Sequence, residues 1–313
     1  MGPRAPSVMN PRRSYTVPLP NRAPLALGAR TLVMGILNVT PDSFADGGRH
    51  LDPVAAIEAG VRMAVDGADI IDIGGESTRP GAEPLSADEE RRRVLPVIER
   101  LAPRIDIPIS IDTYKAPVAR DALAAGATIV NDISGLLYDP ELGRAAADGG
   151  AALVLMHTRG RSKGMYALAR YEDAADEVAR ELEEAIARAE AAGVRRASIV
   201  LDPGLGFAKR AEHSFDVLAH LEKFAALDRP ILVGASRKSF LRAALGDRAP
   251  AAREWGTAAA VAASVLLGAH IVRVHGVKDM VDVVRVADRI RASASEHGAR
   301  ATGTERAGGA ASE

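Results

Sequence analysis

Short apolar runs recur along the chain, and five of them follow a glycine. The runs lie in Gly67–Ile73, Gly126–Val130, Gly150–Met156, Gly193–Leu201 and Gly268–Val272. Glycine just past a helix supplies the left-handed conformation that ends it. A short apolar run without alternation is typical of a parallel strand that is buried on both faces. The pattern therefore predicts a helix, a glycine turn and a buried parallel strand, repeated along the chain.

Three further runs lack the leading glycine but have the same apolar character. They are Thr31–Leu37, Ile107–Ile111 and Pro230–Val233, which brings the predicted strands to eight. Helical patterns lie between the strands. Ser86 and Glu89 have the spacing of a capping box that opens a helix through Leu101. Residues 171–192 carry an apolar stripe at helical spacing, which predicts the clearest helix of the chain.

Eight strands that alternate with helices, with no linker between two halves, predict one (β/α)8 barrel. The alternative is a doubly wound parallel sheet. A length of 313 residues fits one barrel of about 250 residues with two additional arms. We predict a flexible N-terminal arm over residues 1–30, the barrel over 31–294 and a flexible tail over 295–313.

The amino-acid composition excludes several classes of function. Lys plus Arg is 40 and Asp plus Glu is 41, so the net charge of −1 excludes a globally basic nucleic-acid binder. The absence of cysteine excludes disulfides, thiolate catalysis and cysteine-ligated metals. Residues 1–30 lack the apolar core of a secretory signal. The longest uncharged run, Gly256–Val272, is shorter than the roughly 20 residues of a spanning helix, and we expect a buried helix and strand there.

Each predicted strand is followed by polar residues. In a barrel the carboxyl ends of all strands share one face, where active sites lie. A single such residue can be a cap or a turn residue, but polar groups at all eight ends predict a functional site on this face. The polar groups at the ends are Asn38, Glu76, Asp112, Asn131, His157, Asp202, Ser236 and His275.

One group of these residues suits an anion. Arg273 and His275 are two apart on one predicted strand, so both point to the same side. Lys238 follows the preceding strand, and Ser77–Arg79 follow the second strand in a glycine-flanked loop. Cations, hydroxyls and backbone N–H groups fit a phosphate or a pyrophosphate. The alternative for Arg237 and Lys238 is a solvated helix start.

A second group consists of buried acceptors. Asp112, Asn131 and Asp202 would be costly at the mouth of a tight barrel unless donors meet them. A heterocycle with adjacent N–H and NH2 groups supplies such donors. A metal site is the competing use of the two carboxylates, although their spread over two strands favours a pocket wall. His157 is interpreted as a structural residue. Two loops, 38–52 and 74–86, have the length of binding loops.

At this point the residues resemble the dihydropteroate synthase family. Met34–Gly48 is similar to its first signature and Asp72–Gly81 to its second. Shorter matches continue in the family's order at Ser110–Thr113, Asn131–Gly135, Asp202–Phe207, Ser236–Ser239 and Arg273–His275. The resemblance covers roughly residues 30–292.

The resemblance implies a (β/α)8 barrel that joins 6-hydroxymethyl-7,8-dihydropterin diphosphate to p-aminobenzoate and releases pyrophosphate with Mg2+ assistance. It also implies inhibition by sulfonamides, a cytoplasmic homodimer, small-molecule substrates, and neither nucleic acid nor membrane as a partner.

The same resemblance assigns roles to single residues. The residues that would hold the pterin are Asp112, Asn131, Asp202 and Lys238. Those that would hold the diphosphate are Thr78, Arg273 and His275, and Asn38 would help to coordinate Mg2+. Those that would frame p-aminobenzoate are Phe44, Arg79, Pro80 and Ser239. The residues expected to carry catalysis are Asp112, Lys238, Arg273 and His275.

The chain departs from the family's pattern after His275, where the family usually has Asp and Gly276 stands instead. The change removes an acceptor that could orient His275. Two alternatives to the synthase stay open at this stage. One is a pterin-dependent methyltransferase domain of similar fold, and the other is a non-catalytic paralogue that binds pterin.

Overall fold

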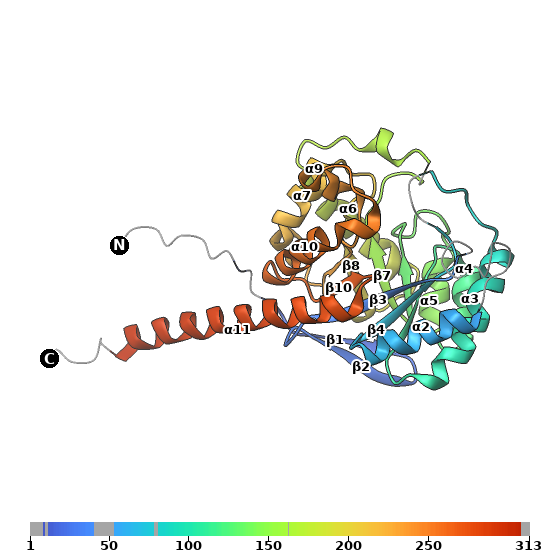
Figure 1. Ribbon diagram of the computed structural model, residues 1–313, viewed down its shortest axis with the longest axis horizontal. Helices are drawn as coiled ribbons and strands as arrows, with labels where there is room; N and C mark the ends of the chain where they lie inside the picture. Colours follow the sequence, from blue (N-terminus) through green and yellow to red (C-terminus); the bar gives the residue numbers. More distant parts are fainter. Residues whose placement is uncertain (1–8, 10–11, 41–52, 78–80, 162, 308–313) are drawn as a thin grey trace.

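The central element is a sheet of eight parallel strands that closes into a barrel (Figure 1). The computed structural model describes residue 9 and residues 12–40, 53–77, 81–161 and 163–307, with side chains up to residue 294. Within this part of the chain the strand order is β8-β7-β6-β5-β4-β3-β10-β9. A parallel bridge between Leu201 and Ile231 joins the two ends. The single (β/α)8 barrel predicted from the sequence is therefore confirmed, and the doubly wound sheet is wrong.

The eight strands coincide with the eight predicted apolar runs. Their bounds are β3 (Leu32–Asn38), β4 (Ile70–Gly74), β5 (Ile109–Asp112), β6 (Ile129–Asp132), β7 (Ala152–Met156), β8 (Ile199–Asp202), β9 (Leu232–Val233) and β10 (Ile271–Val274).

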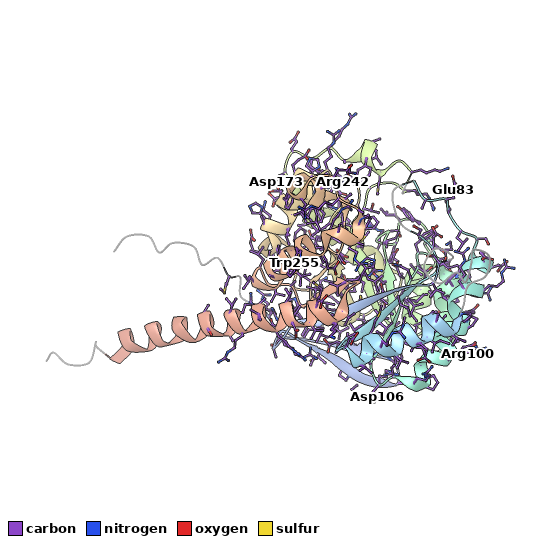
Figure 2. The ribbon with its side chains drawn as sticks, viewed as in Figure 1. Glu83, Arg100, Asp106, Asp173, Arg242 and Trp255 are labelled. Carbon is purple, nitrogen blue, oxygen red and sulfur yellow. The ribbon has the colours of Figure 1, made fainter. Side chains whose placement is uncertain are left out.

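Helices surround the barrel on its outer side. Their bounds are α2 (Pro53–Val65), α3 (Ala87–Leu101), α4 (Ala116–Ala124), α5 (Leu142–Asp148), α6 (Ala174–Ala191), α7 (Ala211–Ala219), α8 (Leu221–Ala225), α9 (Arg242–Leu245), α10 (Glu254–Leu266) and α11 (Val277–Ala307). The predicted cap of α3 is confirmed, because the Ser86 hydroxyl accepts the Glu89 N–H at 3.2 Å. Charged side chains such as Glu83, Arg100 and Asp106 are exposed on the outside (Figure 2).

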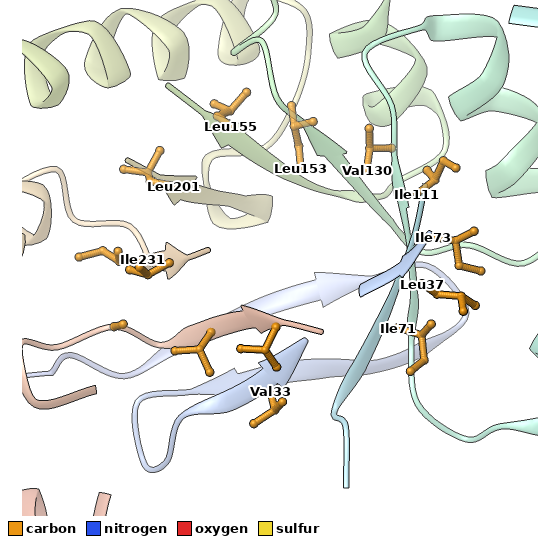
Figure 3. Packing of buried hydrophobic residues seen from close by; sticks show 14 of the residues in the cluster. Val33, Leu37, Ile71, Ile73, Ile111, Val130, Leu153, Leu155, Leu201 and Ile231 are labelled. Carbon is orange, nitrogen blue, oxygen red and sulfur yellow. The ribbon is translucent and has the colours of Figure 1, made fainter. Parts of the chain in front are cut away.

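Successive side chains along each strand belong in turn to two apolar clusters, one outside the barrel and one inside it. Outward residues such as Val33, Ile71 and Leu153 belong to the large cluster that packs the helices onto the barrel (Figure 3). Inward residues such as Met34 and Ile129 form a separate cluster inside the barrel. Further along the same strands the inward positions become polar. The alternation of a strand therefore delivers polar groups to the interior at one end only.

The opposite end of the barrel is covered by a hairpin that the sequence did not predict. Its strands, β1 (Tyr15–Leu19) and β2 (Arg22–Leu27), pair antiparallel. Val17 and Leu27 join the inner apolar cluster. The prediction of a flexible arm is therefore wrong for residues 15–27. The alternating apolar positions of a half-buried strand were present, but the surrounding Pro and Arg residues obscured them.

The C-terminal end also differs from the prediction. We expected a flexible tail from residue 295, but the backbone of α11 continues as helix through Ala307 and runs past the barrel (Figure 1). None of the described helices combines the length and the apolar character that crossing a bilayer requires.

The hairpin generates a stability prediction. Leu27 is 2% exposed and packs in the apolar cluster inside the barrel. Leu27→Ala should therefore lower the free energy of unfolding by about 3 kcal/mol, as for other buried leucines. Ala26, the exposed neighbour on the same strand, is the control, and Ala26→Ser should change it by less than about 0.5 kcal/mol. Urea titration measures both variants. Equal small effects would mean that the hairpin adds nothing to the core.

Candidate active site

One guanidinium links three strands inside the mouth of the barrel. Arg273 on β10 donates through Nε to Asp72 Oδ2 on β4 at 2.6 Å. Its Nη2 donates to Asp112 Oδ2 on β5, also at 2.6 Å. Asn131 on β6 donates through Nδ2 to the same Asp72 oxygen at 3.0 Å. Residues that are up to 201 positions apart in the chain thus form one connected set.

Asp72 is the residue of this set to which sequence reasoning gave no role. Its side chain is fully buried, and its Oδ1 atom has no hydrogen-bond partner among the described residues. A signal was available, because Asp72 is a charged residue between Ile71 and Ile73 in an otherwise apolar strand. Such a buried carboxylate needs a cation or donors, and Arg273 supplies the cation.

Asp202 and Lys238 form the other side of the same mouth. Asp202 Oδ1 accepts the Gly204 N–H at 2.7 Å. The Lys238 ammonium lies 4.6 Å from the centroid of the Phe207 ring. Gly234 lies next to this lysine, since a Cβ atom there would be in van der Waals contact with Lys238 Nζ at 3.6 Å. The lysine is attracted by Asp202 and is not the solvated helix start that was the alternative for it.

Burial changes the ionisation of these groups. It raises the pKa of Asp112 to about 7, against the attraction of Arg273 and with the repulsion of Asp72. It lowers the pKa of Lys238 to about 8, although Asp202 favours the charged form. Burial also disfavours the charge of Arg273, but Asp72 and Asp112 outweigh it and raise the pKa of the guanidinium. Near neutral pH the site therefore contains groups that can change protonation beside a permanent cation.

The ends of β9 and β10 are tied together by Ser236 and His275. The Ser236 hydroxyl lies 2.9 Å from His275 Nδ1, and it accepts the His275 backbone N–H at 3.2 Å. The ring is thus oriented by Ser236, although Gly276 carries no acceptor. Arg237, by contrast, turns away from this group, and its Nε donates to Glu254 at 2.9 Å.

The remaining predicted residues divide into two groups. Asn38 lies at the end of β3, paired in register with Gly74, and Ser239 Oγ is 3.4 Å from Tyr166 Oη. The other predicted residues, Phe44, Thr78, Arg79 and Pro80, lie outside the described residues.

A metal held by protein groups alone finds no support within the described ranges, which contain no cluster of three or more His, Asp or Glu in metal-binding arrangement. The half-buried Asn38 offers one amide oxygen at the mouth. One oxygen ligand suits Mg2+, which commonly keeps waters and binds substrate phosphates.

His157 has the structural role that the sequence suggested. Its Nδ1 lies 2.7 Å from the ammonium of Lys209, and its Nε2 lies 2.9 Å from Glu181. Burial, aided by the charge of Lys209, lowers the pKa of His157 to about 4. Arg159 also pairs with Glu181 and covers the Tyr171 ring at 4.0 Å, so this cation belongs to the same structural network.

Comparison with known proteins gives one consistent result. Residues 34–275 match a family model described as pterin binding enzyme. A dihydropteroate synthase from Synechocystis sp. is 48% identical over 263 residues, which are 84% of this chain and 91% of that protein.

Two solved structures have a similar fold. A Xanthomonas albilineans dihydropteroate synthase with 4-aminobenzoic acid superposes with a TM-score of 0.82 at 42% identity, covering 90% of this chain and 99% of that one. A Yersinia pestis dihydropteroate synthase in a sulfonamide drug complex superposes with a TM-score of 0.82 at 41% identity, covering 88% and 99%.

The His157 network generates a pH prediction. The folded pKa of about 4 lies below the usual 6.5, so between these values the unfolded chain binds more protons than the folded chain. The free energy of unfolding should therefore rise from pH 4 to 6.5, by about 3 kcal/mol from this group at about 1.4 kcal/mol per unit. His157→Gln should flatten that rise. His220, with a 46% exposed side chain, is the control, and His220→Gln should keep it. Identical slopes in the two variants would contradict the assignment.

Proposed function

The chain belongs to the pterin-binding enzymes, and within them to the dihydropteroate synthases, and from this premise we propose how its residues perform the reaction. The enzyme is a transferase that joins 6-hydroxymethyl-7,8-dihydropterin diphosphate to p-aminobenzoate and releases pyrophosphate. The observation that carries the residue assignment is the buried set of Asp72, Asp112 and Asn131 around Arg273 at the carboxyl ends of the strands.

The pterin occupies the interior of this mouth. A pterin ring presents an N–H beside an NH2 group, and carboxylates are acceptors for such paired donors. Asp112 and Asp202 supply these acceptors. Asn131 gives its Nδ2 to Asp72, which leaves its Oδ1 to accept from the ring. Lys238, half-buried and attracted by Asp202, donates to an acceptor on the ring.

The diphosphate lies at the outer edge of the same mouth. A guanidinium has five N–H donors, and two of those on Arg273 are used by Asp72 and Asp112, so the rest can bind phosphate oxygens. His275 lies two residues further along the chain, and Thr78 completes the site by its place in the motif. Asn38 would hold Mg2+ together with the diphosphate, and the bound ion would neutralise charge on the departing pyrophosphate.

The chemistry follows from the charges. The C–O bond to the diphosphate breaks, and pyrophosphate leaves with the electron pair. Positive charge then develops on the pterin methylene, and the carboxylates of the mouth favour it, most strongly when Asp112 is ionised. The amine of p-aminobenzoate forms the C–N bond and loses a proton to the released pyrophosphate or to water. The residues of the mouth act by positioning and electrostatics.

The second substrate and the assembly complete the proposal. Ser239 frames p-aminobenzoate together with Phe44, Arg79 and Pro80, which are assigned by their places in the motifs. The enzyme acts as a cytoplasmic homodimer. Support for a subunit contact comes from Trp255 on α10, which is 85% exposed (Figure 2), and from the exposed Ile290 on the adjoining α11.

The assay that tests this function combines purified protein, pterin diphosphate, p-aminobenzoate and Mg2+. Dihydropteroate and pyrophosphate should form in equal amounts, and a sulfonamide should compete with p-aminobenzoate. Asp112→Ala and Lys238→Ala should each lower kcat/KM by about 100-fold or more, since each removes a buried charged contact to the pterin.

The matched controls are two exposed residues of α11. Asp279→Ala and Lys278→Ala should keep wild-type rates, because both side chains are exposed to solvent. Circular dichroism checks that all variants fold. Wild-type rates in the Asp112 or Lys238 variant would refute the pocket assignment, and absence of product at saturating substrate would refute the proposed reaction.

The raised pKa of Asp112 adds a pH dependence. The carboxylate accepts the pterin N–H only when ionised, and its pKa is about 7. The affinity for pterin diphosphate should therefore fall as the pH drops below 7, by up to about tenfold per pH unit. Asp112→Asn should bind more weakly throughout and show a flatter pH profile than wild type, whereas Asp279→Asn should keep the wild-type profile. Calorimetric titrations between pH 5.5 and 8 compare them, and parallel profiles for wild type and Asp112→Asn would rule Asp112 out as the titrating group.

A further inference from the structure

A strained turn lies between two groups of the site. Arg237 has a φ of 57°, in the left-handed region that residues with a side chain rarely adopt. Its predecessor, Ser236, holds the His275 ring. Its successor, Lys238, is half-buried and attracted by Asp202. The conformation of Arg237 therefore sets the direction in which both site groups enter the mouth.

The first turn of α10 and the residue before it hold this strained turn at three points. The Arg237 N–H donates to Thr257 Oγ1 at 3.0 Å. The Arg237 carbonyl accepts from Arg253 Nη1 at 2.9 Å. The Arg237 side chain donates from Nε to Glu254 Oε2 at 2.9 Å. Strain of this kind persists only where the surroundings determine the conformation, and these three contacts do so.

Gly276 makes the Glu254 contact possible. A Cβ atom at position 276 would stand 2.5 Å from Glu254 Oε1, closer than real contacts allow. That Oε1 atom is buried and has no hydrogen-bond partner among the described residues. Gly276 is not among the residues with positive φ, so its backbone conformation does not demand glycine. A side chain at position 276 would therefore displace the Glu254 carboxylate, the mobile end of its side chain, from the space it fills.

We propose that Glu254 is a positioning residue of this enzyme, whose carboxylate fills the space left open by Gly276 and holds Arg237 so that Lys238 and His275 keep their places. Glu254 acts through Arg237 and touches neither Lys238 nor His275 in the contacts described above. The space beside position 276 is thus occupied by a carboxylate that comes from α10. The inference rests on the proposed function for the roles of Lys238 and His275, but the packing of Glu254 against Gly276 is independent of it.

A set of coupled variants tests the proposal. Glu254→Ala should lower kcat/KM for pterin diphosphate about tenfold or more, through loss of a charge-assisted hydrogen bond. Gly276→Ala should lower it similarly, because the methyl group displaces the carboxylate from Arg237. The double variant with both alanines should be no worse than Glu254→Ala alone, because the methyl group then has nothing to displace.

Rescue distinguishes positioning from general stability. Gly276→Asp alone should be the most damaging change, since two carboxylates would share one space. Combined with Glu254→Ala, it supplies a carboxylate to Arg237 from the other side and should return kcat/KM to within about threefold of wild type. Glu212→Ala, at an exposed position in the first turn of α7, is the control and should leave kcat/KM unchanged. Additive losses in the double alanine variant, or no rescue by Gly276→Asp in the Glu254→Ala background, would overturn the proposal.

A measurement without turnover separates this inference from the proposed function. Amide hydrogen exchange over residues 234–241 should be faster in Glu254→Ala and Gly276→Ala than in wild type, and slow again in Glu254→Ala combined with Gly276→Asp. If the wild type forms no dihydropteroate, the proposed function fails, while the exchange pattern still decides whether Glu254 holds the turn. If the wild type is active but exchange and kcat/KM are unchanged in Glu254→Ala, the positioning role alone is refuted.

Discussion

The buried ion pairs of Arg273 are the interaction on which the site depends. A guanidinium inside a barrel is tolerated only with carboxylates beside it, and Asp72 and Asp112 are themselves tolerated only because of the guanidinium. Removing one partner of such a set leaves an uncompensated buried charge, which costs about 3–5 kcal/mol. The ends of β4, β5 and β10 are therefore held in one arrangement before any substrate binds, and little reorganisation remains for the reaction.

That arrangement requires a barrel that is dry at one end and polar at the other. At the end of the barrel opposite the site, Val17 and Leu27 of the β1–β2 hairpin pack against the apolar inward residues of the strands. This part of the interior therefore needs no polar groups. At the carboxyl ends of the strands, the inward positions carry Asp72 and Asp112 instead. Because strand alternation sends every second residue inward, one apolar and one polar layer follow from the same register.

The fold was predictable because its signals are local, and the missed features are those that depend on distant partners. Each apolar run carries its own evidence of a buried strand, and long motifs marked Asp112 and Lys238. Asp72 was missed because a lone charge in a strand is informative only once Arg273 is known to lie beside it. The hairpin residues, such as Leu27, form a core only against strands far along the chain. Glu254 shows no sign of its contact with Arg237 in the sequence.

Gly276 shows why a departure from a motif has to be judged in three dimensions. Along the chain, glycine after His275 reads as the loss of a carboxylate. In space, a carboxylate oxygen of Glu254 lies 2.5 Å from where the missing Cβ would be, and the other oxygen bonds Arg237. The negative charge against the turn that carries Lys238 comes from Glu254 on α10. The constraint therefore acts on the charge and the volume beside Arg237, and not on position 276 alone. A small residue fits at position 276 because Glu254 already fills the space next to it.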